Sequence, residues 1–445
     1  MNFFKKNFQS KKFLRYFFFF ILITSVFLAG WKTGKSNIPN NLKNPFSSFS
    51  KKQISKNQHL NFLMEVYEII KENYWDKLED EQLINLYVLG TEKLIQKKPA
   101  NKITNLKSLE NFLISTLKEI KDENQKNEFT AQLADIVLAN LQPFGRSRLY
   151  SQKQEISLKN TIENKTEKNY YEILGVNQSA PPDQLKKVFE KKTEELKKEN
   201  TEEAKQKLAE VNKAYQTLSD EFNKKNYDEK RIEPTIEGKL LTPDIFYLKL
   251  GKFSPTTIEE IIRVTQKIDE GQNPTTLILD LRDNIGGLID GLPYFLGPFI
   301  GNDQYAYQFY HQGNKEDFKT KIGWLPSLFR YKKVVVLINQ NTQSSAEVMA
   351  SVLKKYNVGV LVGTKTKGWG TVERIFEIKN QFNPAEKYSV FLVHRLTLRE
   401  DGQPIEAMGV EPVINIQNEN WQNELFNYFR YPELADTIAK LFNQK

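Results

Sequence analysis

The sequence lacks cysteine altogether and has only three histidines among its 445 residues. Without cysteine the chain can form no disulfide bond, no thiolate metal site and no cysteine nucleophile. His59, His311 and His394 lie far apart and match no common spacing of zinc ligands. Neither a metal nor another cofactor is therefore predicted.

Acidic residues are fewer than basic ones, 55 Asp and Glu against 64 Lys and Arg, which gives a net charge of +9. The basic residues are spread along the chain and do not form the single patch typical of a nucleic-acid-binding face. We therefore predict no nucleic-acid partner. Apolar residues make up 39% of the sequence and aromatic residues 12%, which is enough for the buried cores of a globular protein.

One long apolar run lies near the N-terminus and is preceded by five basic residues: Lys5, Lys6, Lys11, Lys12 and Arg15. Taken as 13–31, the run reaches the roughly 17–25 residues that a membrane-spanning helix needs. Positive charge ahead of a span predicts that residues 1–12 stay in the cytoplasm. The chain is then a single-pass protein of the plasma membrane, with its C-terminal bulk extracytoplasmic.

A cleaved signal peptide is the alternative interpretation of this run. Signal cleavage needs two small residues around Ala29, but one of the two positions holds the large Phe27. This favours an uncleaved anchor. The following segment, 32–56, is rich in Asn, Ser, Lys and Pro and predicts a flexible linker.

Helical periodicity begins directly after this segment. Between 57 and 150, apolar residues recur at helical spacing, as at Leu63, Val66 and Ile70. We predict a helical region over these residues. The polar stretch 151–168 predicts a linker behind it.

Residues 168–232 predict a small α-helical module. The segments 170–176, 212–220 and 227–228 resemble the corresponding parts of a J domain of the DnaJ type. The His-Pro-Asp tripeptide, with which J domains stimulate ATP hydrolysis by their chaperone partner, is replaced by Lys197-Lys198-Glu199. A chaperone ATPase is therefore not expected as a partner, and the topology predicted above argues independently against a cytosolic co-chaperone.

From 235 to 420 the pattern changes to an α/β domain. Short apolar runs at 277–281, 334–338 and 360–362 predict buried strands of a central sheet. Helical segments at 257–270 and 346–356 alternate with them. The last residues, 421–445, predict a helical tail.

Motifs in this domain resemble those of the C-terminal processing, or tail-specific, serine peptidases. Residues 280–287 match a strand-end motif that closes with two glycines, 339–348 match the nucleophile segment, and 401–405 and 409–412 match two C-terminal motifs. The resemblance spans about 60–150 and 235–416, and the J-like module lies where the family usually carries a PDZ domain. It implies a ClpP/crotonase-like α/β core.

The resemblance assigns roles to particular residues. Ser344 stands at the position of the nucleophile, although a serine at the start of a helix is often simply an N-cap, and Ser345 is a second candidate for that cap. Gly286 and Gly287 stand where backbone N–H groups can hold an oxyanion. The lysine that the family uses as a base is absent, because Trp369 occupies its position, and Glu373 stands where the family often has glutamine.

Tryptophan cannot accept a proton from serine, so the missing lysine decides the functional prediction. We expect a pseudoprotease, a peptide-binding or scaffolding protein whose partner is a polypeptide client. The alternative is an active serine endopeptidase in which Lys367 acts as the base. Lys365 and Lys367 are separated from Trp369 by four and two positions, so in an extended segment their side chains would point to the same face as that of Trp369. His394 is a further candidate base, although a packed histidine is the expected role for it.

Overall fold

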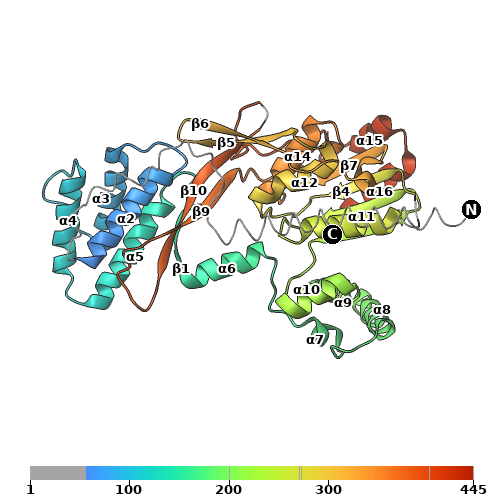
Figure 1. The fold of residues 1–445 in the computed structure, drawn as a ribbon, viewed down its shortest axis with the longest axis horizontal. Coiled ribbons are helices and arrows are strands. Elements are labelled where there is room, and N and C mark those ends of the chain that lie inside the picture. Colours follow the sequence, from blue (N-terminus) through green and yellow to red (C-terminus); the bar gives the residue numbers. More distant parts are fainter. Residues whose placement is uncertain (1–56, 200, 270, 272, 400, 444–445) are drawn as a thin grey trace, which may run out of the picture. The chain divides into compact units, whose positions relative to one another are not determined.

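The computed structural model describes residues 57–199, 201–269, 271, 273–399 and 401–443 (Figure 1). No helix within these ranges is both long and apolar enough to cross a membrane. The predicted basic N-terminus 1–12, the span 13–31 and the linker 32–56 lie outside the described residues.

The helical region predicted for 57–150 consists of α2 (Gln58–Asn73), α3 (Asp80–Ile95), α4 (Leu106–Glu119) and α5 (Glu123–Ala139). Side-chain caps define where these helices begin. The side chain of Asn57 accepts from the N–H of Leu60, and that of Asp122 accepts from the N–H of Gln125. The apolar faces of the four helices meet in one core.

A six-stranded sheet forms the centre of the α/β domain, with strand order β11-β8-β7-β4-β3-β2. Its strands are β2 (Ile236–Thr242), β3 (Ile245–Leu250), β4 (Thr276–Asp280), β7 (Lys333–Ile338), β8 (Val360–Gly363) and β11 (Ile414–Asn415). Only β2 runs antiparallel to its neighbour. The three apolar runs of the sequence thus coincide with β4, β7 and β8.

Helices cover both faces of this sheet (Figure 1). One core contains residues of α11 (Thr257–Asp269), the short η2 (Ile289–Gly291), α12 (Leu292–Ile300), α13 (Pro326–Phe329) and α14 (Ser345–Lys355). The core on the other face contains residues of α15 (Trp421–Phe429) and α16 (Pro432–Asn443). The predicted helical tail is therefore part of the α/β layer structure.

A second sheet was not predicted from the sequence. It contains β1 (Arg148–Ser151), β5 (Tyr305–His311), β6 (Asn314–Lys319) and β10 (Tyr388–Leu398), and β9 (Thr371–Glu377) pairs with β10. Side chains of β10, including Val390 and Leu392, belong to the same core as α2–α5. This sheet therefore joins the helical region to the α/β domain.

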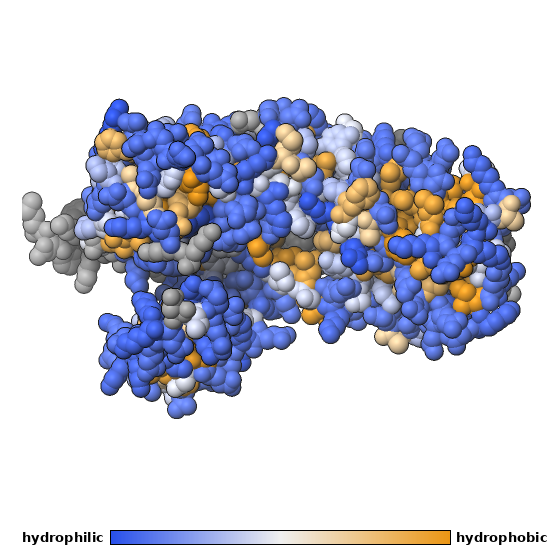
Figure 2. All heavy atoms as spheres, turned by 180° about the vertical axis from the view of Figure 1, so that it is seen from behind, coloured by the Kyte–Doolittle hydropathy of each residue, from blue (hydrophilic) through white to orange (hydrophobic). Residues whose placement is uncertain are grey.

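The J-like module contains α7 (Tyr170–Leu174), α8 (Pro182–Lys198), α9 (Glu202–Leu218) and α10 (Glu221–Lys230) around its own small core. Lys197 and Lys198 belong to the last turn of α8, so of the three residues at the expected tripeptide position only Glu199 lies beyond the helix. The helix continues because Lys residues near its C-terminus interact favourably with the helix dipole. On the face drawn in Figure 2 the module, at lower left, is mostly hydrophilic, with a small hydrophobic area near its middle.

The module is attached to the rest of the chain by two segments, 161–169 and 231–235, which run side by side. We call these segments its stalks. Lys165 and Ile232 form an antiparallel bridge, and the side-chain amide of Asn164 donates to the carbonyl of Glu233 at 2.9 Å. The stretch 151–168, predicted to be a linker, instead contains α6 (Gln152–Ile162). None of the residues of α6 is buried, which explains why an apolar pattern did not reveal it.

Candidate functional site

Ser344 lies at the turn between β7 and α14 with φ 57° and ψ −128°. A left-handed φ is uncommon for a residue other than glycine, and such backbone strain concentrates at functional sites. Ser344 is itself the N-cap of α14. The alternative that Ser345 is the cap was wrong, because Ser345 is the first helical residue and its hydroxyl donates to the carbonyl of Gly287 at 3.1 Å.

Gly286 lies directly against Ser344. A Cβ atom added at Gly286 would lie 2.6 Å from the Cβ of Ser344 and 3.1 Å from its Oγ, and the φ of Gly286 is 82°. Only glycine fits both requirements. The carbonyl of Asn284 accepts from the N–H of Gln343 at 3.0 Å. This hydrogen bond joins the motif 280–287 to the motif 339–348 at the residue directly before Ser344. The structure therefore brings the glycine turn and the serine together.

The two glycines differ in what their N–H groups do. The N–H of Gly286 donates to the side-chain oxygen of Asn284 at 2.8 Å. The carbonyl of Phe253 accepts from the N–H of Leu288 at 2.9 Å. Within the described part of the chain, the N–H of Gly287 between them has no recorded partner. Of the two predicted oxyanion donors, Gly287 is thus the one whose N–H is available.

Glu347 connects the serine to the segment that should carry the base. Its carboxylate is fully buried and accepts four hydrogen bonds. The donors are the hydroxyl of Thr366 at 2.6 Å and the N–H groups of Gly368 at 2.7 Å, Trp369 at 2.8 Å and Ser344 at 2.9 Å. Burial raises the pKa of Glu347, and the four hydrogen bonds oppose that rise. The sequence analysis gave this residue no role, although its fixed spacing after Ser344 was a signal.

Trp369, at the position of the expected lysine, is held on two sides. Its indole N–H donates to Glu373 at 3.2 Å, and the guanidinium carbon of Arg146 lies 3.7 Å from the centroid of its ring. Glu373 also accepts from the hydroxyl of Thr371 at 2.5 Å. Burial raises the pKa of the Glu373 carboxyl.

Arg146, which follows α5 in the chain, was not predicted as a site residue from the sequence. Its guanidinium donates to Glu406 at 2.7 Å and to the hydroxyl of Thr371 at 2.9 Å. A cation over an indole face adds electrostatic attraction to these hydrogen bonds. The position of the expected base is therefore filled by a closed network of side chains.

The two candidate lysines have different surroundings. Lys365 forms an ion pair with Glu411 at 2.9 Å. Lys367 is exposed, and its Nζ lies 5.0 Å from the centroid of the Trp369 ring. Among the described residues, no hydrogen bond is recorded between Lys367 Nζ and Ser344 Oγ. Lys367 thus lies next to Trp369, and no hydrogen bond joins it to Ser344 in the described part of the chain.

His394 has a structural role. Its Nδ1 is 2.7 Å from the carbonyl oxygen of Asn73, and its ring packs 4.5 Å from that of His311. Burial lowers the pKa of His394 to about 4. The expectation of a packed histidine is confirmed. The described residues contain no group of three or more potential metal ligands among His, Asp and Glu side chains.

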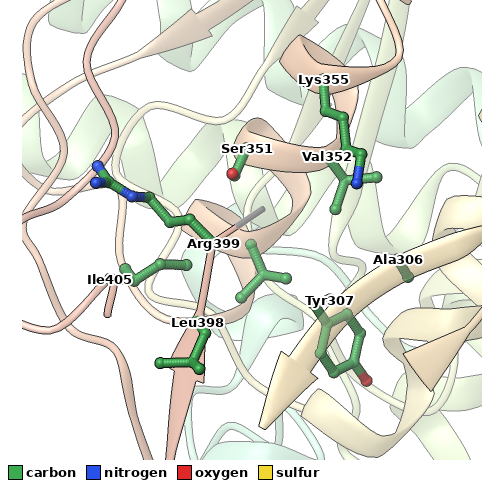
Figure 3. A pocket seen from close by; sticks show the side chains of 9 residues that line it. Ala306, Tyr307, Ser351, Val352, Lys355, Leu398, Arg399 and Ile405 are labelled. Carbon is green, nitrogen blue, oxygen red and sulfur yellow. The ribbon is translucent and has the colours of Figure 1, made fainter. Parts of the chain in front are cut away.

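A small crevice lies beside α14, along the side chains of Ser351, Val352 and Lys355 (Figure 3). It is bounded by α14, β5 and the end of β10. Its lining residues are Ala306, Tyr307, Val348, Ser351, Val352, Lys355, Leu398, Arg399 and Ile405. Ser344 is not among them, so this crevice is separate from the candidate site.

Comparison with known proteins confirms both resemblances. The model of peptidase family S41 matches residues 244–416, and the DnaJ domain model matches residues 169–228. The chain is 30% identical over 210 residues to the carboxy-terminal processing protease CtpA of Bacillus subtilis, covering 46% of this chain and 41% of that protein. It is 23% identical over 389 residues to a probable CtpA-like serine protease of Staphylococcus epidermidis, covering 84% and 70%.

The extent of these matches varies. A carboxyl-terminal-processing protease of Synechocystis is 30% identical over 134 residues, and the match covers 30% of each chain. Among solved structures, the photosystem II D1 C-terminal processing protease has a TM-score of 0.47 and 13% identity, covering 81% of this chain and 94% of that chain. The chain therefore spans less than half of two of these curated relatives and 70% of the third.

Proposed function

We propose that this protein is a polypeptide-binding relative of the C-terminal processing serine proteases that is impaired in catalysis. One observation carries the proposal. At the position of the family's lysine, Trp369 is fixed between Arg146 and Glu373, and no recorded hydrogen bond in the described chain connects Ser344 to a basic side chain.

The chemistry of these groups explains the impairment. A serine hydroxyl needs a neighbouring base to become a good nucleophile. The indole of Trp369 is only a hydrogen-bond donor, and the guanidinium of Arg146 likewise has donors but no acceptor atom. Loss of the base from a serine dyad removes several powers of ten in rate.

The features that would bind a polypeptide remain. Ser344 keeps its strained turn, Gly286 lies directly against it, and the adjacent Gly287 keeps an available N–H. A backbone N–H in this place can hold a peptide carbonyl without any cleavage step. The module in the usual place of a PDZ domain then serves as a spacer or docking surface for the client.

The second candidate function is serine endopeptidase activity with Lys367 as a displaced base. The strained φ of Ser344 and the position of Lys367 Nζ over the Trp369 ring favour it. A movement of the exposed Lys367 side chain would be needed to reach Ser344. Because of this required movement, we rank the endopeptidase function second.

Labelling with a fluorophosphonate probe, which reacts with activated serines, separates the two functions. We expect no labelling of the wild-type protein above that of Ser344→Ala. Labelling of the wild type that is abolished by both Ser344→Ala and Lys367→Ala, with Lys365→Ala as the matched control, would establish the displaced dyad instead. Binding of an unfolded polypeptide such as casein should be measurable in all four proteins.

The membrane anchor is a further part of the proposal. It rests on the apolar run 13–31 and on the five basic residues ahead of it. Protease added to intact spheroplasts should digest the part of the chain after residue 57. Protection of this part until the membrane is opened would place it in the cytoplasm and revive the co-chaperone function.

A further inference from the structure

One buried lysine outside the candidate site contacts the stalk of the J-like module. Lys252 is only 9% exposed, and its ammonium donates to the carbonyl of Thr161 at the end of α6. Burial lowers the pKa of Lys252, and the carboxylate of Glu233 on the other stalk opposes this effect. A buried charged donor is costly unless it is paired, so this contact fixes the stalk strongly.

The residue after Lys252 holds the glycine turn. The N–H of Phe253 donates to the carbonyl of Gly286 at 2.9 Å, and its own carbonyl accepts from Leu288 at 2.9 Å. A Cβ atom at Gly287 would lie only 2.1 Å from the carbonyl oxygen of Phe253. The backbone of Phe253 therefore holds the turn 286–288, which contacts Ser344, in place.

The second stalk reaches the same short segment. The N–H of Gly251 donates to the carbonyl of Thr235 at 2.9 Å. Residues 251–253 thus contact both stalks of the module on one side and the turn 286–288 on the other. A displacement of the stalks has a continuous route of hydrogen bonds to the turn beside Ser344.

We infer that Lys252 is a positioning residue that couples the J-like module to the Gly286–Gly287 turn, so that the state of the module sets the geometry around Ser344. This role goes beyond polypeptide binding and requires no cleavage. It gives the module a regulatory connection that does not depend on a chaperone partner.

Amide hydrogen exchange of the full chain tests this inference. Lys252→Met keeps the length of the apolar stem but removes the donor. We expect exchange in peptides covering 284–290 to accelerate by about tenfold, as for the loss of one buried charged hydrogen bond. Exchange in β4 and β7 should not change, and Lys252→Arg, which keeps a donor, should restore most of the protection.

A second variant loosens the stalk without touching residues 251–253. Asn164 has φ 56°, so Asn164→Gly keeps the backbone conformation and removes the hydrogen bond to Glu233. Coupling predicts that Asn164→Gly also accelerates exchange at 284–290, and that it adds little in a Lys252→Met background. Unchanged exchange at 284–290 in both variants, or equal acceleration throughout the chain, would overturn the inference, whatever the fluorophosphonate result.

Discussion

The guanidinium of Arg146 lies 3.7 Å from the ring centroid of Trp369, across 223 positions of sequence. This pair occupies the position at which the family resemblance predicts a lysine base. The surrounding hydrogen bonds to Glu373 and Glu406 leave the pair well satisfied. The position of the expected lysine is therefore closed by packing and hydrogen bonds.

Restoring the base should create peptidase activity. The double variant Trp369→Lys, Glu373→Gln places an amine in the indole pocket and removes the carboxylate that would hold it protonated. We expect cleavage of casein to rise at least ~100-fold over background, since a positioned base contributes about that much. The single variant Trp369→Lys should gain less.

Adding Ser344→Ala to the double variant controls this experiment. It should remove the new activity completely. Activity that survives Ser344→Ala would come from a contaminant, and absence of activity in a folded double variant would mean that the turn 286–288 no longer supports chemistry.

Glu347 should be important for stability. In Glu347→Gln, an NH2 group replaces one of the two acceptor oxygens and faces backbone N–H donors. We expect a loss of ~2 kcal/mol in the free energy of unfolding, measured by urea denaturation. Glu424→Gln, on the exposed face of α15, is the matched control and should change stability by less than ~0.5 kcal/mol. Equal effects of the two variants would contradict the role of Glu347 as the link between Ser344 and residues 366–369.

The pH dependence of stability should report on Glu373. Its pKa is raised in the folded protein by burial, so above the ordinary glutamate pKa the folded state holds more protons than the unfolded state. Its contribution to stability therefore falls as the pH rises from about 4.5 toward the raised pKa. Glu373→Gln keeps the acceptor oxygen for Trp369 and Thr371 but does not ionise.

Thermal unfolding from pH 4 to pH 7 measures this difference. The stability of Glu373→Gln relative to wild type should increase across the range. A relative stability that stays constant or decreases would indicate that Glu373 is ionised in the folded protein at no cost.

The J-like module should not stimulate a DnaK-type ATPase, because Lys197-Lys198-Glu199 replaces the His-Pro-Asp tripeptide. The triple change Lys197→His, Lys198→Pro, Glu199→Asp restores the missing tripeptide. Steady-state ATP hydrolysis with the wild-type and triple-variant chains measures the difference. Stimulation by the wild type would show that the module acts as a co-chaperone without this tripeptide.

Much of the α/β core was predictable because β4, β7 and β8 are continuous apolar runs, the pattern of strands buried on both faces. The second sheet was not predicted, because a strand such as β6 is mostly exposed and gains its conformation from pairing with β5. The module was predicted from its motifs, but α6 was not, because it has no buried side chain.

The candidate site shows the same division. Ser344, Gly286 and Trp369 lie within local motifs, so the sequence identified their positions. Their relation to Arg146 could not be read from the sequence, since it depends on how the end of α5 packs beside β9 and β10. The participation of Gly286 in a hydrogen bond to Asn284 likewise depends on backbone geometry that composition does not encode.

The paired stalks of the J-like module have a practical consequence. Because Asn164 and Glu233 are joined by hydrogen bonds in both directions, the two ends of the module leave the rest of the chain at one point. Excising the intervening residues would leave a gap that a short turn can bridge, and another compact unit with neighbouring termini can be grafted in its place. The J-like module can thus be replaced by other binding domains at this one attachment point.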